Sequence, residues 1–210
     1  MLFTNWKENL QPLLEKYKNK KHPLSYQNTY QLLIMVVLSA QDSDANINKV
    51  TIPFFTKFPD FNSLSEESTE EIISFISNVE NYQNKAKWIL EMANTLKFNY
   101  KLPTNSKDLM QLKGIGRKSA NVILRETHQK AEGIIVDLHV IRVAPRIGLT
   151  PKIENGNKIE KILMHELPYE IWNDIGMALS FLGRELCRPT SPKCHLCPMR
   201  QHCKYYSSTP

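Results

Sequence analysis

Long hydrophobic runs are missing from this chain of 210 residues, and so is an N-terminal export signal. The longest apolar run, Leu32–Leu38, is far too short to span a bilayer. Residues 1–21 carry charges throughout and contain no apolar core followed by a small-residue cleavage site, which excludes a secretory signal peptide. We therefore expect a soluble cytoplasmic protein without a membrane partner.

Cysteine is absent until Cys187, and all four cysteines then follow as Cys187-x6-Cys194-x2-Cys197-x5-Cys203. In a reducing compartment such clustering favours metal ligation over disulfides. Zinc sites usually have two short Cys-x2–4-Cys arms around a longer loop, and this spacing has only one such arm. A [4Fe–4S] cluster also takes four thiolates, so on chemistry alone it is at least as plausible as zinc.

Glycine is scarce as well, with seven in the chain and none before Gly114. The pair Gly114-Ile115-Gly116 therefore indicates a backbone that turns tightly or closely approaches another group. Lys113 and Arg117 flank the pair, and an amphipathic helix-forming run continues to about residue 127. Amides and cations at a helix N-terminus can bind a phosphate, so we interpret this stretch as a helix-hairpin-helix that grips DNA.

Two ionisable residues near this hairpin are candidates for catalytic roles. Lys118 lies in the first helical turn, where the helix dipole and Arg117 disfavour the ammonium, and a neutral amine can form a Schiff base. Local sequence alone favours a plainer role, a second lysine that binds phosphate. Asp137 should cap the next helix, and its ionised carboxylate could stabilise a cationic transition state at a sugar. For His139, two residues after Asp137, we expect a structural role and not a catalytic one.

No second strand-like run matches Leu32–Leu38, so an all-α fold is the simpler expectation. A break is expected at Pro53. The polar loop Ser39–Asp44 either caps the next helix through Ser43 or Asp44 or directs Gln41 towards a ligand. Helices are expected near residues 6–17, 31–38, 46–55, 65–76, 84–96, 107–112, 117–127, 138–144, 157–166 and 169–182. The net charge of +6 favours a polyanionic partner. Arg188 and Lys193 would give the cysteine loop a basic, DNA-facing surface or simply a solvated one.

Four motifs in this order resemble the endonuclease III family of DNA glycosylases, in the helix-hairpin-helix-GPD superfamily. They are Leu38-Ser-Ala-Gln41, Leu112-x-Gly-Ile-Gly-Arg-Lys-Ser-Ala-Asn-Val-Ile-Leu124, Val136-Asp-Leu-His139 and the cysteine tail. The resemblance implies an all-α fold with two lobes. Residues 22–132 would form a six-helix barrel lobe, and residues 1–21 with 133–210 a lobe holding the [4Fe–4S] cluster.

The resemblance also implies an activity in base excision repair. Lys118 matches the family's Schiff-base nucleophile, Asp137 its catalytic carboxylate, and Gln41 a residue that fills the hole left by a flipped nucleotide. The implied substrate is duplex DNA with a damaged base, an oxidised pyrimidine, or an abasic site. The implied protein is a monomer associated with the nucleoid, which excises the base and cleaves the strand by β-elimination.

Some positions depart from the family pattern. Asn81 stands where the family commonly has a leucine wedge, and it would contact DNA there. Met110 replaces a glutamate near the lesion pocket, where His139 would also lie, and a thioether is a far weaker hydrogen-bond acceptor than a carboxylate. The lesion could therefore differ from the usual ones. Adenine-excising relatives are disfavoured, because they lack the lysine and carry a glutamate in the first core helix.

Two alternatives remain open from the sequence. One is a non-catalytic iron–sulfur or zinc protein that binds DNA in a salt-sensitive way without releasing bases. The other is a monofunctional glycosylase for mismatched or alkylated bases, which would release a base without nicking the strand.

Overall fold

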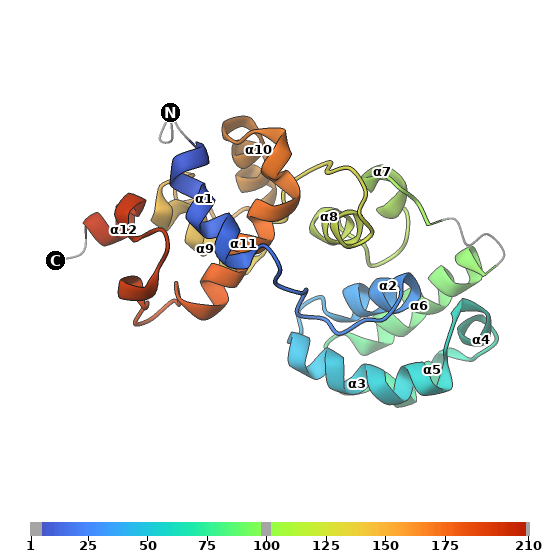
Figure 1. The fold of residues 1–210 in the computed structure, drawn as a ribbon. Helices are drawn as coiled ribbons and strands as arrows, with labels where there is room; N and C mark the ends of the chain where they lie inside the picture. Colours follow the sequence, from blue (N-terminus) through green and yellow to red (C-terminus); the bar gives the residue numbers. More distant parts are fainter. Residues whose placement is uncertain (1–5, 98–101, 209–210) are drawn as a thin grey trace. The chain divides into compact units, whose positions relative to one another are not determined.

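The structure is a computed structural model that describes residues 6–97 and 102–208. All regular secondary structure in this part of the chain is helical, as the sequence predicts. The chain divides into two compact units (Figure 1). One is Lys21–Lys130, and the other joins Met1–Lys20 to Ala131–Pro210.

The unit Lys21–Lys130 is built around the apolar helix α2. Eight of the ten residues of α2 are buried, and α2 packs against α3, α6 and α8 (Figure 1). The Asn28 side chain accepts a hydrogen bond from the Gln31 amide and so fixes where α2 begins. The helices of this unit are α2 (Thr29–Leu38), α3 (Asp44–Lys57), α4 (Phe61–Ser65), α5 (Thr69–Ile76), α6 (Tyr82–Leu96), α7 (Ser106–Leu109) and α8 (Arg117–Glu126).

Aromatic rings fill the space around α2, α3, α4 and α5. Tyr30 meets Phe61 edge to face with ring centroids 4.7 Å apart, and Phe54 meets Phe58 at 4.9 Å. Edge-to-face pairs add roughly 0.5–1.5 kcal/mol each beyond their buried area. The Tyr30 hydroxyl donates to the Phe58 carbonyl at 2.8 Å, so the only polar atom of that ring is satisfied inside the core.

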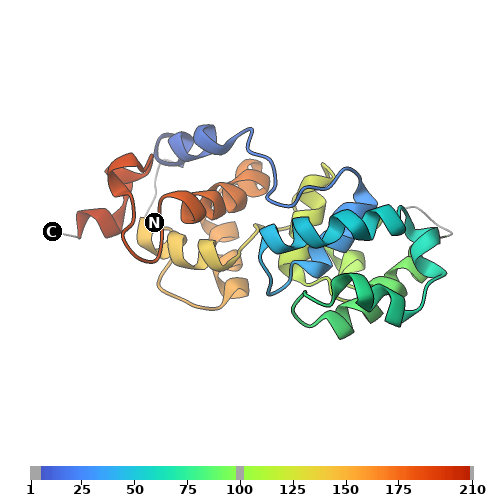
Figure 2. The same cartoon turned by 90° about the horizontal axis from the view of Figure 1, so that it is seen from below.

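The other unit is organised around α11, nine of whose fourteen residues are buried. Helix α11 packs against α9 and α1, and both views show α1 lying along it (Figures 1 and 2). Tyr17 of α1 stacks on Phe181 of α11 at 5.7 Å. The elements of this unit are α1 (Trp6–Tyr17), α9 (Leu138–Ile147), α10 (Gly156–Glu166), η1 (Tyr169–Ile171), α11 (Trp172–Glu185), η2 (Cys194–Leu196), η3 (Arg200–His202) and α12 (Lys204–Ser207).

A glycine of α11 decides how closely the segment before α9 approaches. A β-carbon at Gly176 would lie 2.5 Å from the carbonyl oxygen of Ile135, a contact with backbone that cannot move aside. The neighbouring residues Ile134, Ile135 and Val136 are all buried. The close approach therefore places Asp137, the next residue, directly beside α11.

Several helix boundaries differ from those expected from sequence. Helix α3 continues through Pro53, because the flanking residues Val50 and Phe54 are buried and their packing outweighs one lost backbone hydrogen bond. Helix α9 likewise continues past Pro145 and ends at Gly148, whose backbone is left-handed.

The helix expected over residues 65–76 begins only at Thr69, and a further short helix precedes it. Ser65 ends the short helix α4, which the sequence analysis missed, and α5 begins after its own cap, Ser68. Serine and acidic residues recur through this stretch, so the capping pattern alone fits more than one start. The last expected helix, over 169–182, is preceded by the 3-10 turn η1 and extends to Glu185.

Candidate functional site

The glycine pair forms a tight turn between α7 and α8. Gly114 has φ of 82°, and the Ile115 amide donates to the Leu112 carbonyl at 3.1 Å. A β-carbon at Gly114 would meet Val37 at 2.9 Å and Trp88 at 3.0 Å. The turn is therefore pressed against α2 and α6, and Ile115, with 5% of its surface exposed, anchors it from within.

Gly116, two residues on, has an open environment. It is the N-cap residue of α8, and a β-carbon added there would have no described atom within 4 Å. The first amides of a helix have no partner inside the helix, and this cap supplies none from its side chain. Lys113 and Lys118 are exposed on either side of it, whereas the Arg117 guanidinium donates to Ser106 Oγ at 3.0 Å and braces the turn. The arrangement leaves room for an anion at the N-terminus of α8.

His22, which the sequence analysis did not single out, is close enough to Lys118 for the lysine charge to act on it. Burial lowers the pKa of His22, the Glu126 and Asp44 carboxylates oppose this, and the Lys118 and Arg125 charges add to the lowering. His22 Nδ1 also accepts the Leu24 amide at 3.2 Å, as a neutral imidazole can.

Asp137 lies in the other unit, and its carboxylate is held on both oxygens. Oδ1 accepts the amides of His139 and Val140, each at 2.9 Å, so Asp137 caps α9 as expected. Oδ2 accepts the hydroxyl of Ser180 at 2.6 Å and lies 3.8 Å from a guanidinium nitrogen of Arg184. A carboxylate held in this way is suited to stabilising positive charge.

The two residues expected near the lesion lie in different surroundings. The His139 ring nitrogen Nδ1 is 3.2 Å from Arg142, which also donates to the Gly183 and Cys187 carbonyls. That network gives His139 a structural role inside its own unit. Met110 caps the C-terminal end of α7 and has 39% of its surface exposed, so its side chain is available to a ligand.

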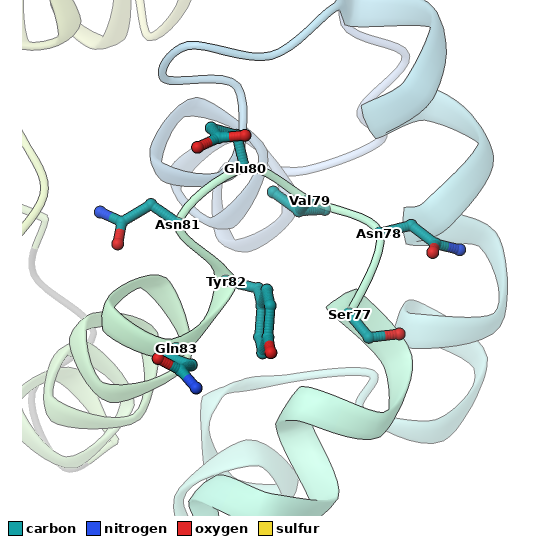
Figure 3. Close-up of a pocket in the computed structure, with 7 residues that line it drawn as sticks. All are labelled: Ser77, Asn78, Val79, Glu80, Asn81, Tyr82 and Gln83. Atoms are coloured by element: carbon teal, nitrogen blue, oxygen red, sulfur yellow. The ribbon is translucent and has the colours of Figure 1, made fainter.

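Gln41 and Asn81 are the exposed tips of two turns in the unit Lys21–Lys130. Both have left-handed backbones, with φ of 62° and 55°. A hollow of about 300 Å³ is lined by residues 77–83. Figure 3 shows the Tyr82 ring directed towards the middle of this turn, while the Asn81 side chain points away from it.

The four cysteines line one further hollow, together with apolar residues of α9 and α11. None of them forms a disulfide. Burial raises the pKa of the Cys197 thiol to about 11; a hydrogen bond from the Met199 amide opposes this, and the other three cysteines add to the rise. No group of three or more His, Cys, Asp or Glu side chains in residues 6–97 and 102–208 is spaced to hold a single metal ion.

Basic residues surround this cysteine loop. Arg188 and Lys193 are both exposed. Arg146, which the sequence analysis missed, donates to the Arg188 carbonyl at 2.7 Å and lies 3.6 Å from Cys187 Sγ. Its guanidinium also stacks on Tyr205 at 4.7 Å. Within the described ranges, no helix is both long and apolar enough to cross a membrane.

Known proteins resemble this chain over most of its length. A family model described as HhH-GPD superfamily base excision DNA repair protein matches residues 34–168. Endonuclease III of Synechocystis sp. is 35% identical over 197 residues, which cover 90% of each protein. Endonuclease III of Bacillus subtilis is 34% identical over 183 residues, covering 86% of this chain and 83% of that protein.

A solved structure points to the same family. It is that of a trapped endonuclease III–DNA covalent intermediate, which matches 96% of this chain and 95% of its own with a TM-score of 0.85 at 33% identity. The expected all-α fold and the expected family are both confirmed. The chain thus belongs to the HhH-GPD superfamily of base excision DNA repair proteins, among relatives of endonuclease III.

Proposed function

We propose that this protein is a base excision repair glycosylase with abasic-site lyase activity, and that Lys118 is its nucleophile. One observation carries the assignment of the nucleophile. Lys118 is exposed in the first turn of α8, immediately after the Gly114–Gly116 turn whose open cap leaves room for a phosphate. A lysine placed there can reach the sugar of a nucleotide whose phosphate is bound by the same helix terminus.

The reaction begins when a damaged nucleotide leaves the base stack. The neutral Lys118 amine attacks C1′, the bond from C1′ to the base breaks, and the base departs with the bonding electrons and takes up a proton. The sugar ring opens, giving an imine between Lys118 and C1′. Loss of a proton from C2′ then expels the 3′ phosphate, which cleaves the strand, and water releases the lysine.

Asp137 supports this reaction as a carboxylate. Its two capping amides and the Ser180 hydroxyl fix the position of the carboxylate, which can stabilise the positive charge that develops on the sugar as the base departs. Lys118 and Asp137 belong to different units of the fold.

The proposed substrate is duplex DNA that contains a damaged pyrimidine or an abasic site. In the unit Lys21–Lys130, Gln41 and Asn81 would enter the duplex at the vacated position. Lys113 and the Gly114–Gly116 turn would hold the phosphates. Arg188 and Lys193 would supply further phosphate contacts, which add affinity without reading sequence.

The decisive experiment is borohydride trapping on a duplex with a single abasic site. Reduction of the imine should link the wild-type protein to DNA covalently. Lys118→Gln should abolish trapping, whereas Lys107→Gln, which removes another exposed lysine from the neighbouring helix α7, should not. Trapping that survives Lys118→Gln would show that another amine is the nucleophile.

Incubation with a panel of single-lesion duplexes, with and without borohydride, separates the two alternative functions. A monofunctional glycosylase for mismatched or alkylated bases would release a base from a panel of single-lesion duplexes without trapping or nicking. A non-catalytic DNA-binding protein would bind the duplexes and release nothing.

We further propose that Cys187, Cys194, Cys197 and Cys203 hold a [4Fe–4S] cluster. The donor set fits chemically, since four thiols free of disulfides line one hollow together with apolar residues, two tyrosines, Lys193 and Arg200. A bound cluster would supply four iron–thiolate bonds that fold the basic loop around a fixed centre. A brown protein with broad visible absorption and about four iron atoms per chain is expected. A colourless protein that contains one zinc ion would overturn the proposal.

A further inference from the structure

The two turns that carry Gln41 and Asn81 are strained at their tips. A left-handed backbone is unfavourable for Gln41 and, to a smaller degree, for Asn81, so the surrounding contacts must hold both residues in place. What holds them is a pair of opposite charges beneath the turns, Asp42 and Lys85.

Lys85 is a cation that the fold almost completely encloses, with 1% of its surface exposed. Its ammonium donates to the Leu38 carbonyl at 2.7 Å and to the Ala40 carbonyl at 2.6 Å. Carbonyls at the end of a helix have no partner inside the helix, and the helix dipole favours a cation there. Lys85 therefore closes the C-terminal end of α2 and fixes the residue just before Gln41.

Lys85 also makes a backbone contact with the Asn81 turn. Its amide donates to the Asn81 carbonyl at 3.1 Å, in the first turn of α6. Burial lowers the pKa of the Lys85 ammonium, and the Asp42 and Glu80 carboxylates act in the opposite direction. One residue thus bonds to Asn81 through its backbone and to the Gln41 turn through its side chain.

Asp42 makes the reciprocal connection. Its Oδ1 accepts the Ser43 amide at 2.7 Å and the Asn46 side chain at 3.0 Å, and its Oδ2 accepts the Glu80 amide at 3.0 Å. Burial works against the carboxylate, but these donors outweigh it and hold the pKa of Asp42 below its usual range. Asn46 also donates to the Asn78 carbonyl at 3.1 Å, so the turns are joined at a further point.

We propose that Asp42 and Lys85 are positioning residues that join the Gln41 turn and the Asn81 turn into one rigid element, so that both side chains enter the duplex together. This inference rests on the proposed function, because it presupposes that Gln41 and Asn81 occupy the space a nucleotide vacates. Figure 3 shows the Asn81 side chain directed away from its own turn, with Glu80 on the adjoining stretch. When the turns are joined, placing one side chain also orders the other, which lowers the entropic cost of the second contact.

The test is a double-mutant cycle on the full-length protein. Affinity is measured for a duplex that carries a tetrahydrofuran abasic-site analogue, using wild type, Gln41→Ala, Asn81→Ala and the double variant. If the turns are joined, the Kd of the double variant should differ by about 5-fold or more from the value expected when the two single losses of affinity are added. Repeating the cycle with Asp42→Ala should reduce the coupling to less than about 2-fold, because the separated turns then act independently.

Matched variants separate positioning from general stability. Lys85→Met removes the charge but keeps an apolar stem of similar length, and it should also abolish the coupling. Asp60→Ala removes a capping carboxylate at α4, and Lys87→Met removes an exposed lysine of α6; both should leave the coupling intact. Affinity for undamaged duplex should change less than about 2-fold in every Asp42 and Lys85 variant, since phosphate contacts are untouched.

A second measurement needs no DNA. Hydrogen exchange at the Glu80 amide should be slow in wild type and at least about 10-fold faster in Asp42→Ala, because that amide loses its acceptor. Unchanged coupling and unchanged exchange in Asp42→Ala would overturn the inference. If wild type does not prefer abasic duplex over intact duplex, the proposed function fails and this inference fails with it. A wild type that prefers abasic duplex but shows no coupling overturns this inference alone.

Discussion

At the scale of single residues, the activity proposed here depends on how each charged group is held. Both carboxylate oxygens of Asp137 accept hydrogen bonds, and one of the donors is the Ser180 hydroxyl of helix α11. Ser180 is buried, with 1% of its surface exposed. Arg184 donates from Nε to the Ser180 hydroxyl at 3.3 Å, so Ser180 links a cation to the carboxylate. Sequence pattern predicts the cap at Asp137, but nothing in it indicates Ser180.

Ser180→Ala should slow base release. The carboxylate loses a charge-assisted hydrogen bond worth about 1.5–3 kcal/mol, of which a part is expressed at the transition state, so we expect a single-turnover rate roughly 10-fold lower. Affinity for abasic duplex should change less than about 2-fold, because Ser180 is buried. Thr51→Val, which removes a buried hydroxyl from the other unit, is the control and should leave the rate unchanged. An unaltered rate in Ser180→Ala would show that the capping amides alone fix Asp137.

Met110→Glu should change which lesions are excised. The exposed thioether accepts hydrogen bonds only weakly, whereas a carboxylate would accept from the N–H groups of a damaged pyrimidine. We expect the relative rates on a panel of oxidised pyrimidines to shift by about 10-fold, the worth of one hydrogen bond to a charged group. Gln111→Glu adds the same charge at the next exposed residue and should slow the excision of all lesions to the same degree. Equal shifts in both variants would mean that only charge repulsion with DNA is at work.

At the scale of elements, the two glycines of the α7–α8 turn have different roles. Gly114 combines a left-handed backbone with close contact to α2 and α6, and Gly116 has open space around it. The sequence predicts that this turn is tight, because glycine is otherwise so rare. It cannot say which glycine faces the core and which faces outward, since that depends on where α2 and α6 pack.

The two glycines should therefore respond differently to alanine. Gly114→Ala should destabilise the protein by about 2 kcal/mol or more, from backbone strain and from the contacts with Val37 and Trp88. Gly116→Ala should leave stability within about 0.5 kcal/mol and lower affinity for abasic duplex several-fold, by obstructing a phosphate. Denaturant unfolding and DNA titration of both variants measure this. A stable Gly114→Ala protein would contradict the packing argument.

At the scale of the whole molecule, the chain forms two units, and the second is completed by joining residues before Lys21 to residues after Lys130. The net charge of +6 describes the entire protein. The exposed pair Arg188 and Lys193 places part of that charge on the cysteine loop. If this loop contacts phosphates, its contribution to affinity must depend on salt.

The dependence of DNA affinity on salt should reveal these contacts. Each phosphate neutralised contributes about −0.9 to the slope of log K against log salt, so Arg188→Gln with Lys193→Gln should make the slope shallower by about 1.8. Lys152→Gln with Lys161→Gln makes the same charge change at exposed positions of the same unit and should alter the slope little. Equal slopes in the two double variants would show that the cysteine loop does not touch DNA.

The sequence by itself determined the features that arise within a few residues of one another. The caps at Ser43 and Asp137, the buried helix α2 and the turn after Leu112 all follow from local chemistry, and the cysteine spacing marks a ligand set. Helical periodicity and capping act over three or four residues, so they can be read directly from the chain. Local rules failed at Pro53, where buried neighbours keep the helix intact.

Only the tertiary structure decided how the polar groups are paired. Asp42 reaches the Glu80 amide across 38 residues of sequence, Ser180 reaches Asp137 across 43, and Lys85 reaches Ala40 across 45. Such pairs form because helices distant in the chain pack together and enclose groups that must then be satisfied. For this reason the nucleophile and its turn could be proposed from sequence, but not Asp42 and the buried Lys85, the charges that we propose hold the Gln41 and Asn81 turns together.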